Sequence, residues 1–338
     1  MRVLQVGLGG FGRGWASLVR ETAEVELVGI ADADPAARAW MPSNLGLPAT
    51  AYFPSLEQAL ATIACDAVLI VTPPDTHRPL AVTALEASKP VLVEKPLATT
   101  LADARTLVAT AARVGQTLMV SQNYRFRRPA RAAQRIVGES QLGNLAAVTI
   151  RCRRDTRTLF PPENFRYTMR HPYVVDMSIH HADLLRAITG QEVRRVYARG
   201  WRVPQSNYQH DPAVIATMTL ETGVTVIYEG TWATNEAETS WNGDWEIIGE
   251  RGRLTWTGGE TDPLQGTITL HPWGEPPREV PQPELARVDR RGTLDAFRRA
   301  IIAGEEPETS ARDNVNSLAI VLACVESLDH DLVATVGG

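Results

Sequence analysis

The feature that most limits the fold of this chain is a glycine-rich turn between a short apolar strand and a helix. Residues 7–12 read Gly-Leu-Gly-Gly-Phe-Gly, directly after the apolar run 2–6, and a helical pattern follows over 11–23. In such a turn the first glycine allows the tight bend, the second lets a pyrophosphate approach the backbone, and the third lets helix pack on strand. A plain tight turn is the alternative, but the strand–turn–helix context favours a dinucleotide site.

Strand and helix patterns alternate through the first third of the chain. Strands are expected at residues 2–6, 26–31, 67–71, 90–93 and 117–120, and helices at 11–23, 56–62, 77–88 and 101–114. This is the spacing of βαβ units, and apolar strands with little alternation are typical of a parallel sheet covered on both faces. The sequence therefore predicts an α/β fold that begins with a Rossmann domain, a doubly wound parallel sheet, over residues 1–122.

The pattern changes after residue 123. Apolar and polar residues alternate in several short segments separated by turn residues, which indicates an antiparallel sheet. The expected strands are 148–152, 192–201, 213–220, 224–232, 244–249, 252–256 and 266–271, and the expected late helices are 293–303 and 311–328. We expect residues 123–338 to form a second, α+β domain.

Two acidic residues follow the second expected strand, and their surroundings assign them different roles. Asp34 precedes Pro35, as an N-cap residue precedes a proline at the first helical position. Asp32, twenty residues after Gly12, is then the better partner for the ribose hydroxyls of a dinucleotide. A carboxylate there repels a 2′-phosphate, so NAD is favoured, while Arg13 and Arg38 leave NADP open.

Lysine is almost absent from the chain. Lys89 and Lys95 are the two lysines, against 32 arginines, and Lys95 lies in Glu94-Lys95-Pro96 just after an expected strand. An ammonium is compact and shifts its pKa readily, whereas a guanidinium stays charged. Lys95 therefore stands out as a place where ammonium chemistry is needed, although the bias could also have left it there by chance.

A helix expected over residues 175–186 carries two adjacent histidines that point in different directions. At 100° per residue, Asp176, His180 and Asp183 share one face, whereas His181 points toward apolar residues. A histidine beside carboxylates is a natural general acid–base group. A solvated polar face and a metal site built on the same three residues are the alternatives, and we expect no metal.

Composition excludes several classes of protein. Of the 338 residues 44% are hydrophobic and 22% charged, and the net charge is −5, so neither nucleic acid nor a membrane is an expected partner. The three cysteines (Cys65, Cys152 and Cys324) are far apart in apolar surroundings, which suits a reducing, cytoplasmic environment better than a disulfide framework.

Taken together, the chain resembles the glucose–fructose oxidoreductase / inositol dehydrogenase / MocA (Gfo/Idh/MocA) family of NAD(P)-dependent oxidoreductases nearly from end to end. The resemblance is carried by residues 7–12, 72–77, 84–87, 94–97 and the pattern Asp176-x-x-x-His180-x-x-Asp183. The Glu-Lys-Pro motif and the Asp-His-Asp helix are the most specific parts. The family typically has glycine where this chain has Ser178, which changes no catalytic group.

The resemblance implies roles for particular residues. Lys95 would bridge the substrate hydroxyl and the cofactor ribose, His180 would exchange the hydroxyl proton, and Asp176 would hold the substrate and orient this catalytic pair. The expected cofactor contacts are Gly7, Gly9, Gly10, Phe11, Gly12, Asp32, Thr72, Pro73, Pro74, His77, Glu94, Lys95 and Asn123. The expected substrate contacts are Lys95, Tyr124, Arg153, Tyr167, Asp176, His180 and Trp232.

The resemblance also implies an open, mostly antiparallel C-terminal sheet whose broad face makes homodimers or homotetramers. Val224, Val226, Tyr228 and Trp232 share one strand face, and Ile227 is apolar on the other, so both faces of this strand need cover. The expected cofactor is NAD, with NADP left open, and the expected substrate is a sugar, cyclitol or related polyol. Aromatic faces and arginine or asparagine donors suit such a ring.

Three functions remain open at this point. The first is an NAD-dependent dehydrogenase or reductase acting on a hydroxyl or keto carbon. The second is a redox-neutral glycosidase or lyase that oxidises its substrate transiently, and the same residues would serve it. The third is a ligand-sensing regulator without catalysis, which the presence of both Lys95 and His180 disfavours.

Replacing Lys95 by arginine tests the role of the ammonium. Lys95→Arg keeps the charge, but the longer planar group cannot occupy the same bridging position, so turnover should fall by orders of magnitude. Steady-state kinetics on the true substrate measure this. Near wild-type turnover in the variant would show that the assigned role of Lys95 is wrong.

Overall fold

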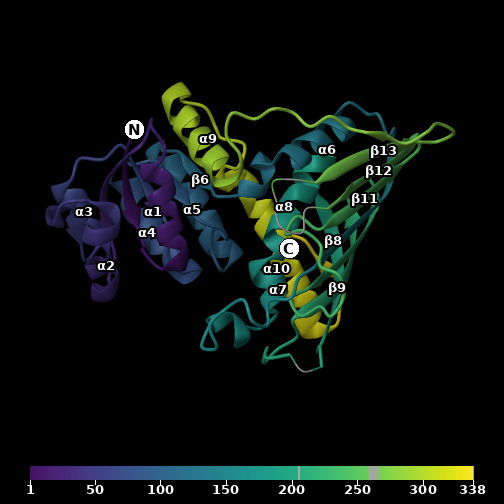
Figure 1. Ribbon diagram of the computed structural model, residues 1–338, viewed down its shortest axis with the longest axis horizontal. Coiled ribbons are helices and arrows are strands. Elements are labelled where there is room, and N and C mark those ends of the chain that lie inside the picture. Colours follow the sequence, from purple (N-terminus) through teal and green to yellow (C-terminus); the bar gives the residue numbers. More distant parts are fainter. Residues whose placement is uncertain (205, 259–263, 265, 338) are drawn as a thin grey trace. The chain divides into compact units, whose positions relative to one another are not determined.

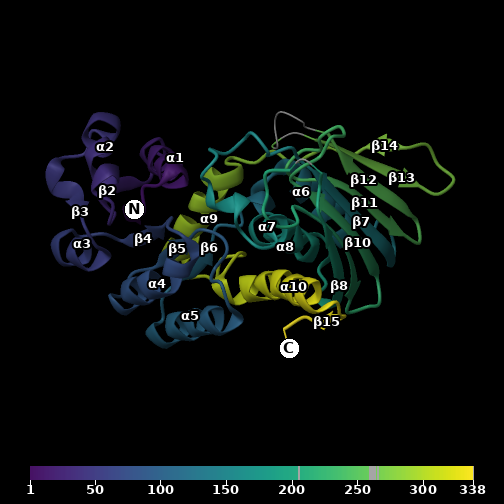
Figure 2. The ribbon, with the colours of Figure 1, turned by 90° about the horizontal axis from the view of Figure 1, so that it is seen from below.

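A computed structural model describes residues 1–204, 206–258, 264 and 266–337, without the side chains of residues 37, 38, 42, 43 and 49. The chain divides into two compact units, drawn in Figures 1 and 2. The first comprises residues 1–122 and 290–315, and the second comprises residues 123–289 and 316–338. Residues 290–315 thus belong to the first unit, whereas they were expected in the second domain.

The first unit contains a six-stranded parallel sheet. Its strands, in spatial order, are β3 (Tyr52–Phe53), β2 (Glu26–Ala31), β1 (Arg2–Val6), β4 (Ala67–Ile70), β5 (Val91–Val93) and β6 (Leu118–Val120). The order reverses between β1 and β4, and ligands of such sheets bind outside the carboxyl ends of the strands at that reversal. The predicted Rossmann fold is confirmed.

The helices of this unit begin with the caps that their sequences provide. They are α1 (Gly10–Arg20), α2 (Pro35–Leu45), α3 (Leu56–Thr62), α4 (His77–Glu86) and α5 (Leu101–Val114), followed much later by α9 (Asp289–Ala303). The Thr100 side chain accepts a hydrogen bond from the backbone N–H of Asp103, and Asp34 accepts one from Ala36. Both residues are N-caps, and the structural role predicted for Asp34 is confirmed.

The return of the chain to the first unit rests on backbone pairing at the edge of its sheet. The N–H of Val120 in β6 donates to the carbonyl of Thr309 (2.9 Å), and the Thr309 hydroxyl donates to the carbonyl of Val120 (2.8 Å). Met119 and Ser310 form an adjacent antiparallel bridge. The segment before α10 (Ala311–His330) therefore covers an edge strand that would otherwise expose unpaired backbone groups.

The second unit contains a nine-stranded sheet. In spatial order its strands are β14 (Arg278–Glu279), β13 (Thr267–Pro272), β12 (Gly252–Thr257), β11 (Asp244–Gly249), β7 (Leu145–Arg153), β10 (Thr225–Thr231), β9 (Ala213–Leu220), β8 (Val193–Trp201) and β15 (Ala334–Thr335). All neighbours pair antiparallel except β7 and β10, which run parallel. The expected open, mostly antiparallel sheet is confirmed, and it is mixed at this one pair.

In the described part of the chain, helices cover one face of this sheet and leave the other open. Helices α6 (Arg128–Gly138), α7 (Pro172–Asp176), α8 (Ser178–Thr189) and the later part of α10 lie on the same side of the strands (Figures 1 and 2). Along β10 the side chains of Val226 and Tyr228 point into this core, with 0% and 3% exposure, whereas Ile227 between them is 44% exposed. The open face therefore carries apolar residues.

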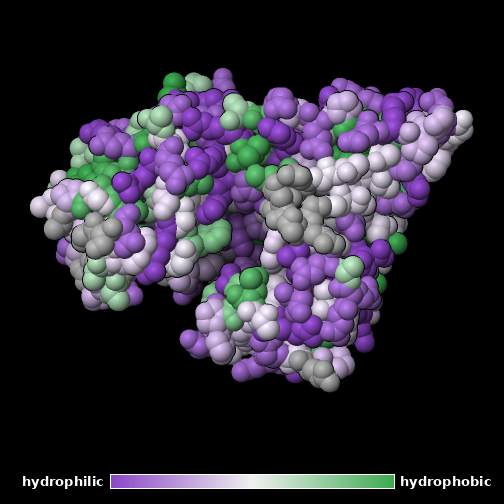
Figure 3. Space-filling model, viewed as in Figure 1, coloured by the Kyte–Doolittle hydropathy of each residue, from purple (hydrophilic) through white to green (hydrophobic). Residues whose placement is uncertain are grey.

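The remaining apolar surface is scattered. On the side of the molecule drawn in Figure 3, hydrophilic residues predominate and apolar residues form small groups.

Cys65, Cys152 and Cys324 are buried free thiols, and burial raises the pKa of Cys152 to about 11. None of the helices in the described part of the chain is long and apolar enough to span a bilayer.

Candidate functional site

The four glycines of the turn after β1 are required for two different reasons. A Cβ on Gly7 would lie 2.2 Å from the carbonyl oxygen of Val71, and one on Gly12 would lie 2.5 Å from the carbonyl oxygen of Gly7. Gly7 also has a positive φ of 94°. At Gly9 and Gly10 a Cβ would meet nothing within 4 Å. The fold itself therefore explains Gly7 and Gly12, whereas open space at Gly9 and Gly10 fits a ligand that approaches the backbone.

The start of α1 offers this ligand unpaired donors. Gly9 is the N-cap, no side chain caps the helix, and no acidic residue lies in its first turn. A helix N-terminus of this kind binds anions through its N–H groups. Phe11 is 57% exposed, and the Arg290 guanidinium lies 5.0 Å from the centre of its ring. These features fit the pyrophosphate of a dinucleotide.

Two polar side chains hold the turn in shape. The buried Gln5 amide donates to the carbonyls of Gly7 and Gly12, both at 2.8 Å, a role that was not predicted. The Asp32 carboxylate accepts from the backbone N–H groups of Leu8 (2.6 Å) and Asp34 (2.8 Å). Because each carboxylate oxygen accepts more than one hydrogen bond, Asp32 can still receive ribose hydroxyls.

The segment after β4 corrects the role expected for His77. Pro73 and Pro74 lead into a short 3₁₀ turn (Pro74–Thr76), and the Thr76 hydroxyl donates to that of Thr72 at 2.7 Å. His77 is fully buried, with Nδ1 2.8 Å from the carbonyl of Pro96 and Nε2 3.0 Å from that of Thr72. Burial lowers the pKa of His77. With no exposed ring atom it cannot meet a cofactor or solvent; it lies between two loops, and the neutral imidazole, which carries one N–H, donates to one of the two carbonyls.

Lys95 follows a buried carboxyl group at the end of β5. Glu94 Oε1 accepts from the indole N–H of Trp15 (2.7 Å), and Oε2 accepts from the backbone N–H of Lys95 (3.0 Å). Burial raises the pKa of Glu94, although these hydrogen bonds oppose the shift. The Lys95–Pro96 peptide bond is cis. The Glu94 side chain therefore contacts α1 and the Lys95 backbone, and it holds the backbone N–H of Lys95 in place.

The helix expected over residues 175–186 is in fact two helices. Helix α7 ends at Asp176 and α8 begins at Ser178, with Met177 between them. The Ser178 hydroxyl donates to the carbonyl of Val174 at 2.6 Å, and such back-bonding commonly bends helices. Asp176 therefore ends α7, whereas His180 and Asp183 lie on α8, so the single helix predicted for the three residues is interrupted at Met177.

The two adjacent histidines have different environments, as the helical pattern predicted. His181 is 1% exposed: its Nδ1 is 2.9 Å from the hydroxyl of Tyr228, and its Nε2 is 3.0 Å from the carbonyl of Trp241. Since a carbonyl only accepts, Nε2 carries the proton and Nδ1 accepts from Tyr228. Burial lowers the pKa of His181 to about 4. His181 is thus a neutral structural residue.

His180 is instead stacked on an aromatic ring. Its imidazole and the phenol ring of Tyr124 lie with centroids 4.1 Å apart and planes 8° apart. Burial raises the pKa of Tyr124 to about 12, so the phenol stays protonated. The Arg127 guanidinium also lies on the Tyr124 ring, 3.3 Å from its centre. Neither face of Tyr124 is therefore open for the substrate stacking that a predicted contact residue could provide.

The two acidic residues near His180 are both bound to arginines. Asp176 Oδ2 lies 2.6 Å from Nε of Arg166, and the Arg166 guanidinium rests on the rings of Phe160 and Phe165. Asp183 is 1% exposed and accepts two hydrogen bonds from Arg125, at 2.6 and 2.7 Å. Each of the two carboxylates thus already has an arginine partner. Among the described side chains no group of three possible metal ligands occurs.

Two of the expected substrate contacts are core residues. Trp232 is 2% exposed and packs against Phe160, Tyr173 and Tyr208. Tyr167 is 4% exposed, and its hydroxyl lies 3.1 Å from the carbonyl of Phe160. Both predictions are corrected, because these side chains fill the sheet core and have no open face.

Two further predicted residues already have partners in the second unit. Arg153 Nη1 lies 3.3 Å from the carboxylate of Glu236, and it remains partly exposed. Asn123, an expected cofactor contact, donates through Nδ2 to Asp289 at 2.6 Å. The structure therefore shows both residues in ion pairs or hydrogen bonds within their own unit.

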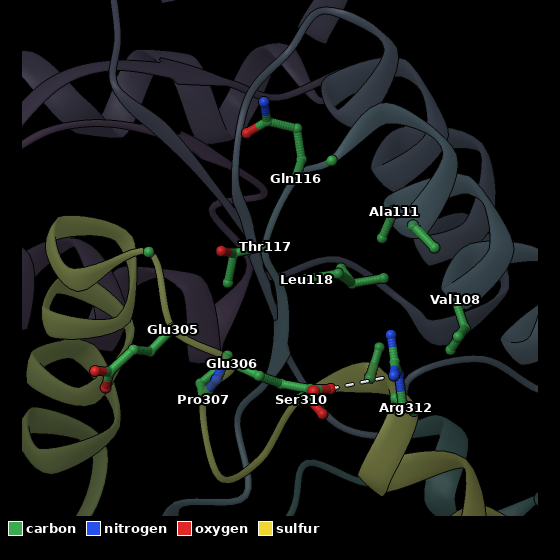
Figure 4. A pocket seen from close by; sticks show the side chains of 14 residues that line it. Val108, Ala111, Gln116, Thr117, Leu118, Glu305, Glu306, Pro307, Ser310 and Arg312 are labelled. Carbon is green, nitrogen blue, oxygen red and sulfur yellow. Dashed lines mark ion pairs between the residues drawn. The ribbon is translucent and has the colours of Figure 1, made fainter.

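A cavity of about 250 Å³ opens at a different edge of the first unit (Figure 4). Its wall includes Ala111 and Leu118, and at its rim Arg312 Nε lies 3.5 Å from Glu306 Oε1. The cavity lies at the amino end of β6, whereas the glycine turn lies at the carboxyl end of β1. It is therefore separate from the dinucleotide turn.

The fold and the glycine turn define a dinucleotide-binding protein, and sequence comparison narrows the class. Residues 1–122 match the model of an oxidoreductase family with an NAD-binding Rossmann fold, and residues 130–255 match the GFO/IDH/MocA C-terminal domain. The chain belongs to the Gfo/Idh/MocA family of NAD-binding oxidoreductases. The resemblance inferred from the sequence is confirmed, and so is the cofactor class, NAD.

Individual relatives agree with this assignment. D-apiose dehydrogenase of Paraburkholderia graminis is 30% identical over 335 residues, which is 94% of this chain and 85% of the relative. The 1,5-anhydro-D-fructose reductase of Ensifer adhaerens is 27% identical over 279 residues, 81% of this chain and 80% of the relative.

A solved structure supports the fold as well. The oxidoreductase of Agrobacterium radiobacter in complex with NAD⁺, L-tartaric acid and magnesium superposes with a TM-score of 0.87. The two chains are 21% identical, and the match covers 100% of this chain and 98% of the other. At this identity the likeness establishes the shared architecture.

The open space at Gly9 leads to a prediction about NAD binding. Gly9 has a φ of −59°, which alanine adopts freely, so Gly9→Ala should leave the fold of the apoprotein intact, with a small fall in melting temperature because alanine is a poorer N-cap than glycine. The added methyl group should still weaken NAD binding at least about tenfold, or about 1.4 kcal/mol, because the backbone can no longer approach the pyrophosphate. Calorimetric titration with NAD measures this. Gly138→Ala, also in open space but in α6, is the control, and equal affinities in both variants would contradict the assignment.

The buried neutral His181 predicts acid sensitivity. The unfolded chain binds this proton below about pH 6.5 and the folded chain only below about pH 4, so stability is lost as pH falls through that window. The loss should approach about 1.4 kcal/mol per pH unit, and about 3 kcal/mol in all. His181→Gln should flatten this dependence in urea unfolding between pH 7 and 4.5, whereas exposed His210→Gln should not. An unchanged slope in His181→Gln would refute the prediction.

Proposed function

We propose that the protein is an NAD-dependent dehydrogenase or reductase that transfers hydride between nicotinamide and a hydroxyl or keto carbon of a polyhydroxylated compound. The observation that carries the proposal is the contrast between His181, locked and neutral in the core, and His180, held by its ring plane. A sugar, cyclitol or related polyol is favoured because the relatives include D-apiose dehydrogenase and inositol 2-dehydrogenase.

Each residue has a proposed part in the oxidation of such a hydroxyl. NAD, when bound, supplies the hydride acceptor. Lys95 donates a hydrogen bond to the hydroxyl oxygen and favours its ionisation, while His180 takes the hydroxyl proton as the carbon loses hydride. In reduction His180 returns the proton. Asp176 shares its carboxylate between Arg166 and a substrate hydroxyl, which a carboxylate with four acceptor sites allows.

NAD is proposed over NADP on electrostatic grounds. Asp32 ends β2 with a carboxylate bound to the glycine turn, where it would repel a 2′-phosphate. Of the two arginines that left NADP open, Arg13 stacks on the ring of Trp40 at 4.6 Å. The side chain of Arg38 lies outside the described part of the chain.

A screen of substrates with both nucleotides tests the proposal. Sugars, cyclitols and keto sugars, with D-apiose and myo-inositol tried first, are offered with NAD(H) and NADP(H) while nicotinamide absorbance is followed. Net NADH formation or consumption with one class of polyol supports the proposal. Release of a leaving group without net NADH would favour the redox-neutral alternative, and no reaction with any member would contradict both.

Replacing the two histidines separately tests their assigned roles. His180→Ala should lower turnover by orders of magnitude with little change in stability. His181→Ala should lower the melting temperature, because it removes partners of Tyr228 and Trp241, but should lower turnover per folded molecule much less. Kinetics and thermal melting on both variants check this. A lower turnover in His181→Ala than in His180→Ala would show that the assigned roles are wrong.

We also propose that the open sheet face joins copies of this chain into a dimer or tetramer. Trp201, Ile215 and Ile227 lie on this face with 41–46% exposure. An apolar patch on a broad open sheet is typical of an interaction surface.

The three buried free thiols suit a reducing compartment, so we place the enzyme in the cytoplasm.

A charge placed in the middle of this face should disrupt assembly. Ile227→Lys should lower the molar mass in light scattering toward that of one chain, because burying an unpaired ammonium is costly. Ile302→Lys, at a 71% exposed isoleucine on α9, is the matched control and should leave the mass unchanged. An Ile227→Lys protein with the wild-type mass would exclude this face as the interface.

A further inference from the structure

We infer that Tyr124 and Arg127 are positioning residues for His180, and that they fix the plane of its imidazole by a three-layer stack. The inference rests on the proposed catalytic role of His180. It assigns Tyr124 a function other than the predicted contact with substrate. All residues of the stack belong to the second unit.

The geometry of the stack is well defined. The imidazole of His180 lies parallel to the Tyr124 ring, within 8°, at a centroid distance of 4.1 Å. The Arg127 guanidinium carbon lies 3.3 Å from the same ring centre. Two groups so close to one ring cannot share a face without overlapping, so they cover opposite faces. The order of layers is therefore imidazole, phenol, guanidinium.

The outer layer is itself fixed. Arg127 is 4% exposed, and its Nε and Nη2 both lie 2.7 Å from Oδ2 of Asp289. Its Nη1 donates to Oδ1 of Asn242, and Asn123 donates to the other oxygen of Asp289. A guanidinium held on three nitrogens in a planar fork cannot slide off the ring. Arg127 therefore covers the second face of the Tyr124 ring with a planar group that is held in place.

Residues 124–127 contact α8 at a second point. Arg125, the residue after Tyr124, makes a bidentate ion pair with Asp183, one helical turn beyond His180. The Ser317 hydroxyl donates to Asp183 at 2.9 Å from α10. The rotation of α8 and the plane of the His180 ring are thus both set by residues 124–127.

Such control matters for proton transfer. The second side-chain torsion of histidine has broad minima, so an unsupported imidazole samples several planes. A general base must point a nitrogen lone pair at the hydroxyl within hydrogen-bond distance, and small misplacements cost large factors in rate. A flat ring on one face of the imidazole removes that freedom without using its nitrogens.

Three variants separate positioning from simple packing. Tyr124→Phe keeps the flat ring and should keep kcat within about threefold. Tyr124→Leu replaces it by a smaller branched side chain without a flat face and should lower kcat about tenfold to a hundredfold, with little change in KM. Turnover is measured on the most active polyol of the substrate screen. His180→Ala is assayed beside them as the reference for loss of the base.

A spectroscopic measurement on the apoprotein needs no substrate. With ¹³C-labelled histidine, the ring protons of His180 should show the upfield shift of a group stacked on an aromatic face, assigned by their absence in His180→Ala. The shift should persist in Tyr124→Phe and disappear in Tyr124→Leu. If Tyr124 only fills the core, the shift of the His180 ring protons should not change together with kcat across the Tyr124 variants.

The outcomes are distinguishable. If His180→Ala keeps its turnover, the proposed function fails. If His180→Ala is inactive but folded Tyr124→Leu keeps kcat within twofold, or the His180 shift survives in it, the inference is overturned. Should Tyr124→Leu not fold, Arg127→Lys replaces it, because lysine keeps the charge without the flat cover. That variant should lower kcat several-fold and move the His180 shift, and wild-type values for both would overturn the inference.

Discussion

The close approach of two strand ends is the constraint on which the first unit depends. The backbone after β1 comes so near to the end of β4 that a single methyl group on Gly7 would lie 2.2 Å from the Val71 carbonyl. This approach brings the reversal of strand order, the free N–H groups of α1 and the Asp32 carboxylate to one edge of the sheet. The binding chemistry of this unit thus follows from a steric requirement, because only glycine lets the two chain segments meet.

Local patterns were enough to predict much of this architecture. Strand and helix spacing gave the parallel sheet, the Asp34-Pro35 pair gave the start of α2, and helical periodicity separated His180 from His181. Each of these inferences depends on residues within about one turn or one strand of each other. The glycine fingerprint likewise assigned different roles to Gly9 and Gly12, and the structure agrees, since a Cβ would meet nothing at Gly9 but would lie 2.5 Å from the Gly7 carbonyl oxygen at Gly12.

What the sequence could not reveal depends on distant contacts. The pairing of Val120 with Thr309 spans 189 residues, and no local sequence pattern predicts it. The burial of Trp232 and Tyr167 follows from rings contributed by separate segments. The interruption at Met177 lies beside a hydroxyl bond from Ser178 to the Val174 carbonyl, and the Tyr124 stack includes an arginine held by Asp289. Two of the arginines use the planar, forked shape of the guanidinium, because Arg127 covers the Tyr124 ring and Arg125 pairs with both oxygens of Asp183.

The return of residues 290–315 to the first unit also orders events in the synthesis of the chain. A growing chain emerges from its N-terminus, and domains fold as their residues become available. The edge of β6 waits for Thr309 and Ser310, which are made only after all the long strands of the second sheet. The first unit is therefore begun first, but it is completed only after residues 123–289 of the second unit have been made. During translation its open edge must stay unpaired, or be guarded by other factors, for most of the time that the ribosome needs to make the protein.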